Sequence, residues 1–143
     1  MAHGTPLTDA DRWDWLISLR QLCLSEISHG ATGVVLTCSG LKQKYRDVLR
    51  IASFYDSSIL VHFVYLQANE ETLLQRVRSR QGHYMKDDMV RSQFAILEEP
   101  TLQEKDVLSV NVSGTPPEVN EAALNVVKQT LEKVVKKVHV SST

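Results

Sequence analysis

The chain has 143 residues, of which 43% are apolar and 23% are charged, and its formal net charge at pH 7 is −1. This length is typical of a single domain, and the apolar share is enough to bury a core. The small net charge excludes a large field that would recruit nucleic acid or an anionic membrane. No apolar run is as long as a membrane span, and the first residues lack a basic-then-apolar signal, so we expect a cytoplasmic protein. Cys23 and Cys38 have neither CxxC spacing nor a neighbouring histidine, and we expect both to be reduced.

The first half of the sequence alternates between helical and β-rich patterns. Thr8, followed three residues later by an aspartate, resembles a capping box, and apolar residues then recur at helical spacing to about Gly30. The run 33–38 predicts a short strand that is buried on both faces. Residues 41–50 return to the helical period, and 58–66 is the strongest strand pattern in the chain.

The second half continues the same alternation. Asn69 is expected to cap a helix that runs to about Arg80, and a further helix is predicted over 86–97. The run 107–112 predicts a third strand, and the pattern at 115–118 is a second capping box that opens a long helix. Strands that alternate with helices imply a parallel sheet with helices on both faces. We therefore expect one α/β domain over residues 1–143.

The helix over 41–50 carries the first candidate site. Lys42, Arg46 and Arg50 are spaced four residues apart and form a positive stripe beside the apolar one. The helix follows a predicted parallel strand, and open α/β sheets bind ligands at that end. These cations and the Tyr45 hydroxyl are suited to the carboxylate and hydroxyls of a polyhydroxy acid. The alternative, which spacing alone favours, is a solvated basic face in which Asp47 pairs with Arg50.

The second candidate site follows the Asn69 helix. Arg76 and Arg80 lie on one helix face, with Gly82 and His83 just beyond them. Mobile arginines are suited to neutralise the charge on a transferring phosphoryl group. The alternative is that arginines at the end of a helix complement the helix dipole. The sequence pattern leaves both interpretations open.

Four segments of the chain resemble the gluconokinases, small P-loop kinases that phosphorylate gluconate. Residues 38–50 follow the family pattern Cys-Ser-Ala-Leu-Lys-Lys-x-Tyr-Arg-Asp-x-Leu-Arg, except that Gly40 replaces the alanine and Gln43 replaces the second lysine. Residues 76–84 are similar to the family's lid, where Arg-x-x-x-Arg-x-Gly-His-aromatic recurs. Residues 4–16 match the helical region that covers the substrate, and 93–100 match a segment to which we assign packing.

The resemblance implies a fold, a reaction and a set of site residues. The implied fold is a P-loop kinase-like, three-layer αβα domain of the nucleoside-monophosphate-kinase type, with a lid over about 76–92. The implied reaction is the phosphorylation of D-gluconate to 6-phosphogluconate by ATP with Mg²⁺, and the implied partners are these small molecules, with a homodimer left open. The resemblance assigns substrate binding to Lys42, Tyr45, Arg46, His83 and Arg12, and assigns ATP binding and phosphoryl stabilisation to Arg76 and Arg80.

One family feature is absent from the printed sequence. Nothing reads G-x-x-x-x-G-K-[S/T], the loop whose backbone N–H groups and lysine hold ATP phosphates. The resemblance implies that this loop, its helix and two strands would precede Met1, so we expect a truncated chain with impaired catalysis. The alternative is a non-catalytic remnant that binds a sugar acid or a partner protein. A different small-molecule or nucleotide kinase of the same fold is a third possibility.

Overall fold

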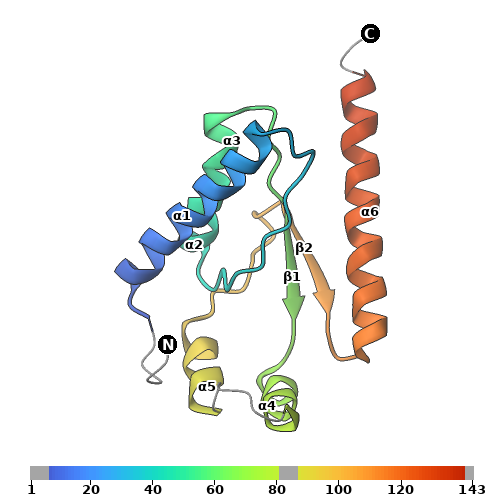
Figure 1. Ribbon diagram of the computed structural model, residues 1–143. Coiled ribbons are helices and arrows are strands. Elements are labelled where there is room, and N and C mark those ends of the chain that lie inside the picture. Colours follow the sequence, from blue (N-terminus) through green and yellow to red (C-terminus); the bar gives the residue numbers. More distant parts are fainter. Residues whose placement is uncertain (1–6, 81–86, 141–143) are drawn as a thin grey trace.

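The computed structural model describes residues 7–80 and 87–140, with only the backbone described for 138–140 (Figure 1). Two parallel strands pair in register from Phe63↔Val107 to Gln67↔Asn111, which confirms the expected α/β class with a parallel sheet. No helix in this part of the chain is long and apolar enough to cross a lipid bilayer. The elements in chain order are α1 (Asp9–Ser28), α2 (Gln43–Arg50), α3 (Ala52–Tyr55), β1 (Phe63–Gln67), α4 (Glu70–Ser79), α5 (Asp87–Ile96), β2 (Val107–Asn111) and α6 (Pro116–Val140).

The helix ends follow the capping patterns in the sequence. The Thr8 side chain accepts a hydrogen bond from the Asp11 N–H (3.2 Å), and the Asp11 carboxylate accepts one from the Thr8 N–H (3.0 Å), so the capping box of α1 is confirmed. Gly30 follows the end of α1 with φ of 100°, a left-handed conformation that glycine adopts without strain. The Asn69 side chain caps α4 by accepting from the Thr72 N–H (2.8 Å).

The core lies between α1, α2 and the start of β1. Its buried centre consists of Leu16 from α1 with Tyr45, Val48 and Leu49 from α2, and Phe63 packs against it. Figure 1 shows α1 running alongside α2 on one side of the strands. This packing brings the first turn of α1 beside the first turn of α2.

The segment 33–38 corrects one prediction. It is not a strand, because no neighbouring strand in the described chain forms a ladder with it. Leu36 and Cys38 still pack against the core cluster, whereas Val35 points away from it and is 97% exposed. The segment therefore keeps the alternation of a strand without its hydrogen bonds. Two further differences are that β1 begins at Phe63 rather than at residue 58, and that the short helix α3 follows α2.

β1 leaves one edge open. In a parallel ladder, alternate residues direct both their N–H and C=O groups to the same neighbour. The Phe63 N–H donates to Asp106 O (2.9 Å), and Gln67 O accepts from the Val112 N–H (3.0 Å). Phe63, Tyr65 and Gln67 therefore face β2, and the backbone groups of Val64 and Leu66 face the opposite edge. Among the described residues, no strand pairs with that edge.

The apolar surface beside the sheet is also uncovered. α6 begins near the carboxyl end of β2, runs beside the strand and extends well past its amino end (Figure 1). None of its residues from 116 to 137 is buried, and Leu124 and Leu131 are 50% and 59% exposed. Leu66 on β1 is 55% exposed. A parallel sheet is normally covered by helices on both faces, so this exposed apolar surface is available to pack against another element.

The open edge makes a prediction for hydrogen exchange. We expect the amides of Val64 and Leu66 to exchange about tenfold or more faster than those of Tyr65 and Gln67, because only the latter two donate to β2. Residue-resolved exchange measured by NMR checks this. Equal protection at all four amides would contradict an unpaired edge.

Candidate functional site

The first turns of α1 and α2 form a polar cluster around one carboxylate. Asp9 is the first residue of α1, and Lys42 is the residue that precedes α2. The Lys42 Nζ lies 3.2 Å from Asp9 Oδ1, and both the Lys44 Nζ and the Tyr45 hydroxyl also donate to the Asp9 carboxylate. We call these four residues, together with Arg12, the α1–α2 cluster.

The ring of Tyr45 is the centre of this cluster. It is only 1% exposed, because the core cluster surrounds it. The Arg12 Cζ lies 5.7 Å from its centroid, and the Nζ atoms of Lys42 and Lys44 lie 5.6 and 5.8 Å from it, distances at which cations are attracted to an aromatic face. Three cations against the single carboxylate of Asp9 leave an excess of positive charge. The structure thus brings together Arg12, Lys42 and Tyr45, three of the residues that the resemblance assigned to substrate binding.

The contacts fix the charge states within the cluster. Hydrogen bonds from Lys44, Tyr45 and Lys42 hold the pKa of Asp9 well below its usual range. The hydrogen bond to Asp9 raises the pKa of Lys42 in turn. At neutral pH, Asp9 is therefore a carboxylate and Lys42 an ammonium ion. The Lys44 and Asp9 side chains are 48% and 49% exposed, so solutes can reach this charged group.

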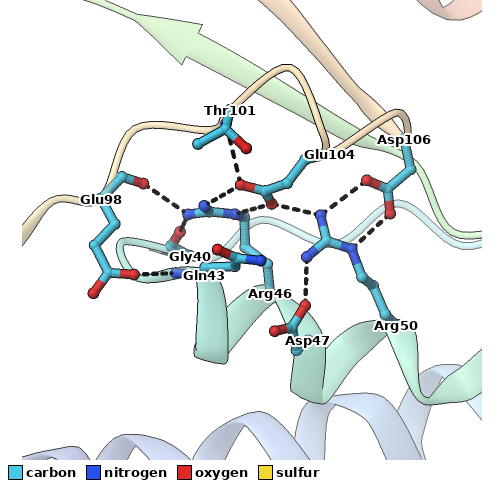
Figure 2. Close-up of polar contacts among 9 residues, drawn as sticks. All are labelled: Gly40, Gln43, Arg46, Asp47, Arg50, Glu98, Thr101, Glu104 and Asp106. Carbon is cyan, nitrogen blue, oxygen red and sulfur yellow. Dashed lines mark hydrogen bonds and ion pairs between the residues drawn. The ribbon is translucent and has the colours of Figure 1, made fainter.

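Arg46, a fourth predicted substrate ligand, is instead a structural anchor. It is 4% exposed and forms a bidentate pair with Glu104, with Nε–Oε2 and Nη2–Oε1 distances of 2.8 and 2.6 Å. Its Nη1 donates to the carbonyl oxygens of Gly40 (2.8 Å) and Glu98 (3.1 Å). Figure 2 shows all these contacts within the protein. The side chain has no face left for a ligand because the carboxylate and two carbonyls surround it.

Arg50 continues the same network one turn later. It donates to both carboxylate oxygens of Asp106 (2.7 and 2.8 Å), to Glu104 (2.6 Å) and to Asp47 (2.7 Å) (Figure 2). The Asp47 contact confirms the predicted pair within the helix. Arg46, and then Arg50, lower the pKa of Glu104 to about 2. We call the set Arg46, Arg50, Glu104 and Asp106 the arginine–carboxylate network; it ties α2 to the loop that precedes β2.

The predicted lid residues are not assembled into a site in the described structure. The Nη2 of Arg76 donates to the carbonyl oxygens of Val112 and Gly114 (3.0 Å for Gly114), so this side chain holds the loop between β2 and α6. Arg80 ends α4, is exposed, and forms no ion pair with any carboxylate in the described ranges. His83 lies outside the described residues. The proposed roles of Arg76, Arg80 and His83 therefore remain predictions.

A hollow of about 500 Å³ lies where the carboxyl ends of the two strands meet, the end at which parallel sheets bind ligands. Glu99 in its wall accepts a hydrogen bond from the Tyr65 hydroxyl (3.0 Å), and burial together with this carboxylate raises the pKa of Tyr65 to about 12. The wall carries two carboxylates and no cation, so it lacks a group that would bind an anion. Its lining residues are Gln67, Ala68, Asn69, Glu70, Thr72, Phe94, Glu99, Asn111 and Ser113.

A parallel β-sheet with helices after its strands places the chain among the α/β proteins, and the comparison with solved structures below is consistent with a P-loop kinase-like fold. The chain is 34% identical over 141 residues to a probable gluconokinase of Mus musculus, covering 90% of this chain and 75% of that protein. A solved gluconokinase from Sinorhizobium meliloti 1021 superimposes with a TM-score of 0.79 at 31% identity, over 96% of this chain and 73% of that one. The chain belongs to the gluconokinase family.

The comparisons also show how much of the relatives is matched. The chain is 48% identical over 128 residues to a probable gluconokinase of Schizosaccharomyces pombe, and it is 37% identical over 121 residues to the thermosensitive gluconokinase of Escherichia coli. It spans 66% and 62% of the lengths of these two proteins, and 89% and 85% of its own length is matched. No protein-family model matches the chain.

Sequence reasoning identified most of the cluster but missed the part played by Lys44. Lys44 lies off the stripe formed by Lys42, Arg46 and Arg50, so helical spacing did not single it out. Asp9 lies in the segment 4–16 that resembles the substrate-covering region, and sequence left open whether it orients substrate or belongs to a helix cap or a local charge pair. Its contact with α2 bridges more than thirty residues of sequence (|i−j| of 33 for Lys42), and no local pattern encodes it.

The arginine–carboxylate network makes a stability prediction. Substitution of Arg46→Ala leaves Glu104 as a buried and half-paired carboxylate, and we expect this to lower the free energy of unfolding by about 3–5 kcal/mol. Urea denaturation checks it. The matched control is Arg78→Ala, which breaks the exposed pair with Asp87 and should change stability little. Equal losses in the two variants would show that burial of the Arg46 pair is not what matters.

The depressed pKa of Glu104 makes a pH prediction. Because its folded pKa of about 2 lies below the ordinary value of 4.5, this group contributes stability that is present above about pH 4.5 and is lost as the pH falls toward 2. We expect the stability difference between wild type and Glu104→Gln to shrink across that interval. Urea midpoints measured at several pH values check it, and a constant difference would contradict the assignment.

Proposed function

We propose that this chain carries the sugar-acid-binding part of a gluconokinase, the enzyme type that phosphorylates D-gluconate to 6-phosphogluconate with ATP. The observation that supports this most is the α1–α2 cluster, in which Arg12, Lys42 and Tyr45 gather from two distant segments. The names of the relatives support the substrate, since the relatives compared above are gluconokinases or probable gluconokinases.

The chemistry of the cluster fits a sugar acid. The ammonium groups of Lys42 and Lys44 are compact point charges for a carboxylate, and Arg12 adds positive charge behind them. The Tyr45 hydroxyl can donate to an oxygen or accept from a hydroxyl. A neutral sugar would leave this excess charge unused, so the cluster favours an anionic polyol. Arg46 is left out of this binding set because the arginine–carboxylate network occupies it.

The residues present do not fit the phosphate side of the reaction. The 143 residues contain no G-x-x-x-x-G-K-[S/T] loop. Within residues 7–80 and 87–140, no three side chains of His, Cys, Asp or Glu gather in a way that could hold a metal ion. We therefore assign no residue here to Mg²⁺, and Arg76 and Arg80 stay candidates for contact with ATP. We propose that this chain binds gluconate but transfers phosphate poorly by itself.

Calorimetry of gluconate binding tests this proposal. We expect Lys42→Ala to weaken gluconate binding about tenfold, the loss of one charge-assisted contact. Lys128→Ala on the exposed surface of α6 is the matched control and should bind as wild type. Gluconate binding that is insensitive to Lys42, or absent from the wild-type chain, would contradict the proposed site. ADP release with gluconate should stay near background, and turnover at the level of an ordinary kinase would contradict the assignment of phosphate binding.

The open edge of β1 favours a second candidate, a chain that acts by binding a partner polypeptide. Val64 and Leu66 present unpaired backbone groups, and the Leu66 side chain is itself 55% exposed. A strand from another polypeptide can add to such an edge, with the main chain supplying the hydrogen bonds. The gluconokinase of S. meliloti contains residues beyond the 73% that this chain matches, so a relative offers segments for that position.

Co-expression separates the two candidates. The probe is the part of the S. pombe relative that this chain does not match, and co-elution in gel filtration would support strand addition. Val64→Pro removes one N–H from the free edge and leaves the β2 ladder intact, whereas Val64→Ala keeps that N–H. We expect only the proline variant to lose association. Equal association of both variants would contradict pairing at this edge.

A further inference from the structure

We infer that Asp9 is a built-in occupant of the carboxylate-binding site in the α1–α2 cluster, and that a sugar acid binds by displacing it. The inference rests on the proposed function and deepens it, since it names the residue that sets which ligands gain access. Asp9 would then be a specificity-determining residue.

The contacts of Asp9 are those that a bound carboxylate would make. Its two oxygens accept from the Lys42 Nζ, the Lys44 Nζ and the Tyr45 hydroxyl. Two ammonium groups and a phenol that converge on one carboxylate are a donor set for charge-assisted hydrogen bonds. Neither lysine forms an ion pair with any other carboxylate in the described chain. Asp9 therefore fills the position that the ligand's carboxylate needs.

Asp9 can leave this position at little cost. Its side chain is 49% exposed, and ion pairs at such exposure contribute little to stability. The cap of α1 is formed by Thr8 and Asp11, so α1 keeps its capping box when Asp9 turns away. Tyr45 is fixed by the core, so its hydroxyl stays in place when Asp9 leaves.

Arg12 gives a second and independent indication that an external anion is needed. It is 8% exposed and forms no ion pair with a carboxylate anywhere in the described ranges; the contact that places it is with the Tyr45 ring, 5.7 Å away. The Tyr45 ring attracts this cation but carries no net negative charge that would balance it. Asp9 is already shared by three other donors. An incoming carboxylate adds the negative charge that the cluster lacks.

Displacement has a consequence for selectivity. A ligand must bring its own carboxylate to replace the three hydrogen bonds that Asp9 gives up, and a neutral polyol cannot do this. The apparent affinity for the acid is reduced by the fraction of molecules in which Asp9 occupies the site. Removal of the Asp9 charge therefore strengthens binding of the acid and leaves binding of the neutral polyol unchanged.

The test compares gluconate with glucitol, which carries a CH₂OH group in place of the carboxylate. We expect Asp9→Asn to bind gluconate about tenfold more tightly than wild type at constant ionic strength, with glucitol unaffected. Asp14→Asn is the matched control, because Asp14 is exposed on the same helix and its side chain forms no ion pair with any described residue. Both variants are measured by calorimetry on the full chain, and thermal unfolding verifies that each is folded.

The outcomes separate the inference from the proposed function. Acetate serves as a second probe, a carboxylate without the polyol chain. Weaker or unchanged binding of both gluconate and acetate by Asp9→Asn overturns the inference, since Asp9 then supports the ligand or does not meet it. Asp9→Ala serves the same comparison if the asparagine variant does not fold. Tighter binding of acetate without tighter binding of gluconate supports Asp9 as the occupant and contradicts gluconate as the substrate. Equal gains in Asp9→Asn and Asp14→Asn overturn the inference in favour of a general charge effect.

Discussion

The buried pairing of Arg46 with Glu104 is the contact on which the geometry of the candidate site depends. A guanidinium and a carboxylate that are both almost inaccessible to water are costly to desolvate, and the pair is favourable only because its remaining hydrogen-bonding groups are satisfied. The carbonyl oxygens of Gly40 and Glu98 accept hydrogen bonds from Arg46, and Arg50 also donates to the Glu104 carboxylate (Figure 2). The network holds the turn before α2 and the loop before β2 in one arrangement. The position of Lys42 and Tyr45 follows from it, because Tyr45 directly precedes Arg46 and Lys42 lies four residues before it.

The cationic side chains of α2 and of the residue before it therefore have two different roles. The stripe Lys42, Arg46 and Arg50 looks uniform in sequence, yet two of its members are enclosed by carboxylates from the chain itself and one points toward α1. What distinguishes them is the location of the acids, which lie more than fifty residues away for Arg46 and Arg50 (|i−j| of 58 and 56). A motif that reads as one binding surface thus divides into an anchor and a candidate ligand site. Arg76 is a similar case, because its Nη2 donates hydrogen bonds to two backbone carbonyl oxygens.

The features that sequence predicted correctly are those encoded locally. The capping residues Thr8 and Asn69 begin their helices as expected, and the parallel pairing of β1 with β2 follows from alternating helices and strands. The segment 33–38 failed as a strand because strand formation depends on a neighbour, and periodicity records only the burial preference of each side chain. For the same reason, sequence placed Arg12 and Tyr45 in a common site but could not show that Asp9 would join them. The sequence also could not show that the apolar side of α6 is exposed, since an apolar stripe predicts packing without identifying the packing partner.

The two halves of the proposed chemistry differ in how completely this chain builds them. Within the described residues, the contacts that shape the α1–α2 cluster come from α1, α2 and the loop before β2. The two helices share one core, and hydrogen bonds join α2 to that loop. The edge of β1, by contrast, presents backbone groups that nothing in the described residues uses, next to apolar surface with no cover. Recognition of a sugar acid needs only the first region, because a carboxylate site requires fixed cations and not a finished sheet. Phosphoryl transfer requires a phosphate-binding loop, a unit of strand, loop and helix, for which the open edge is a structurally suitable position. The proposed binding of a sugar acid and the transfer of phosphate thus depend on different regions of the fold.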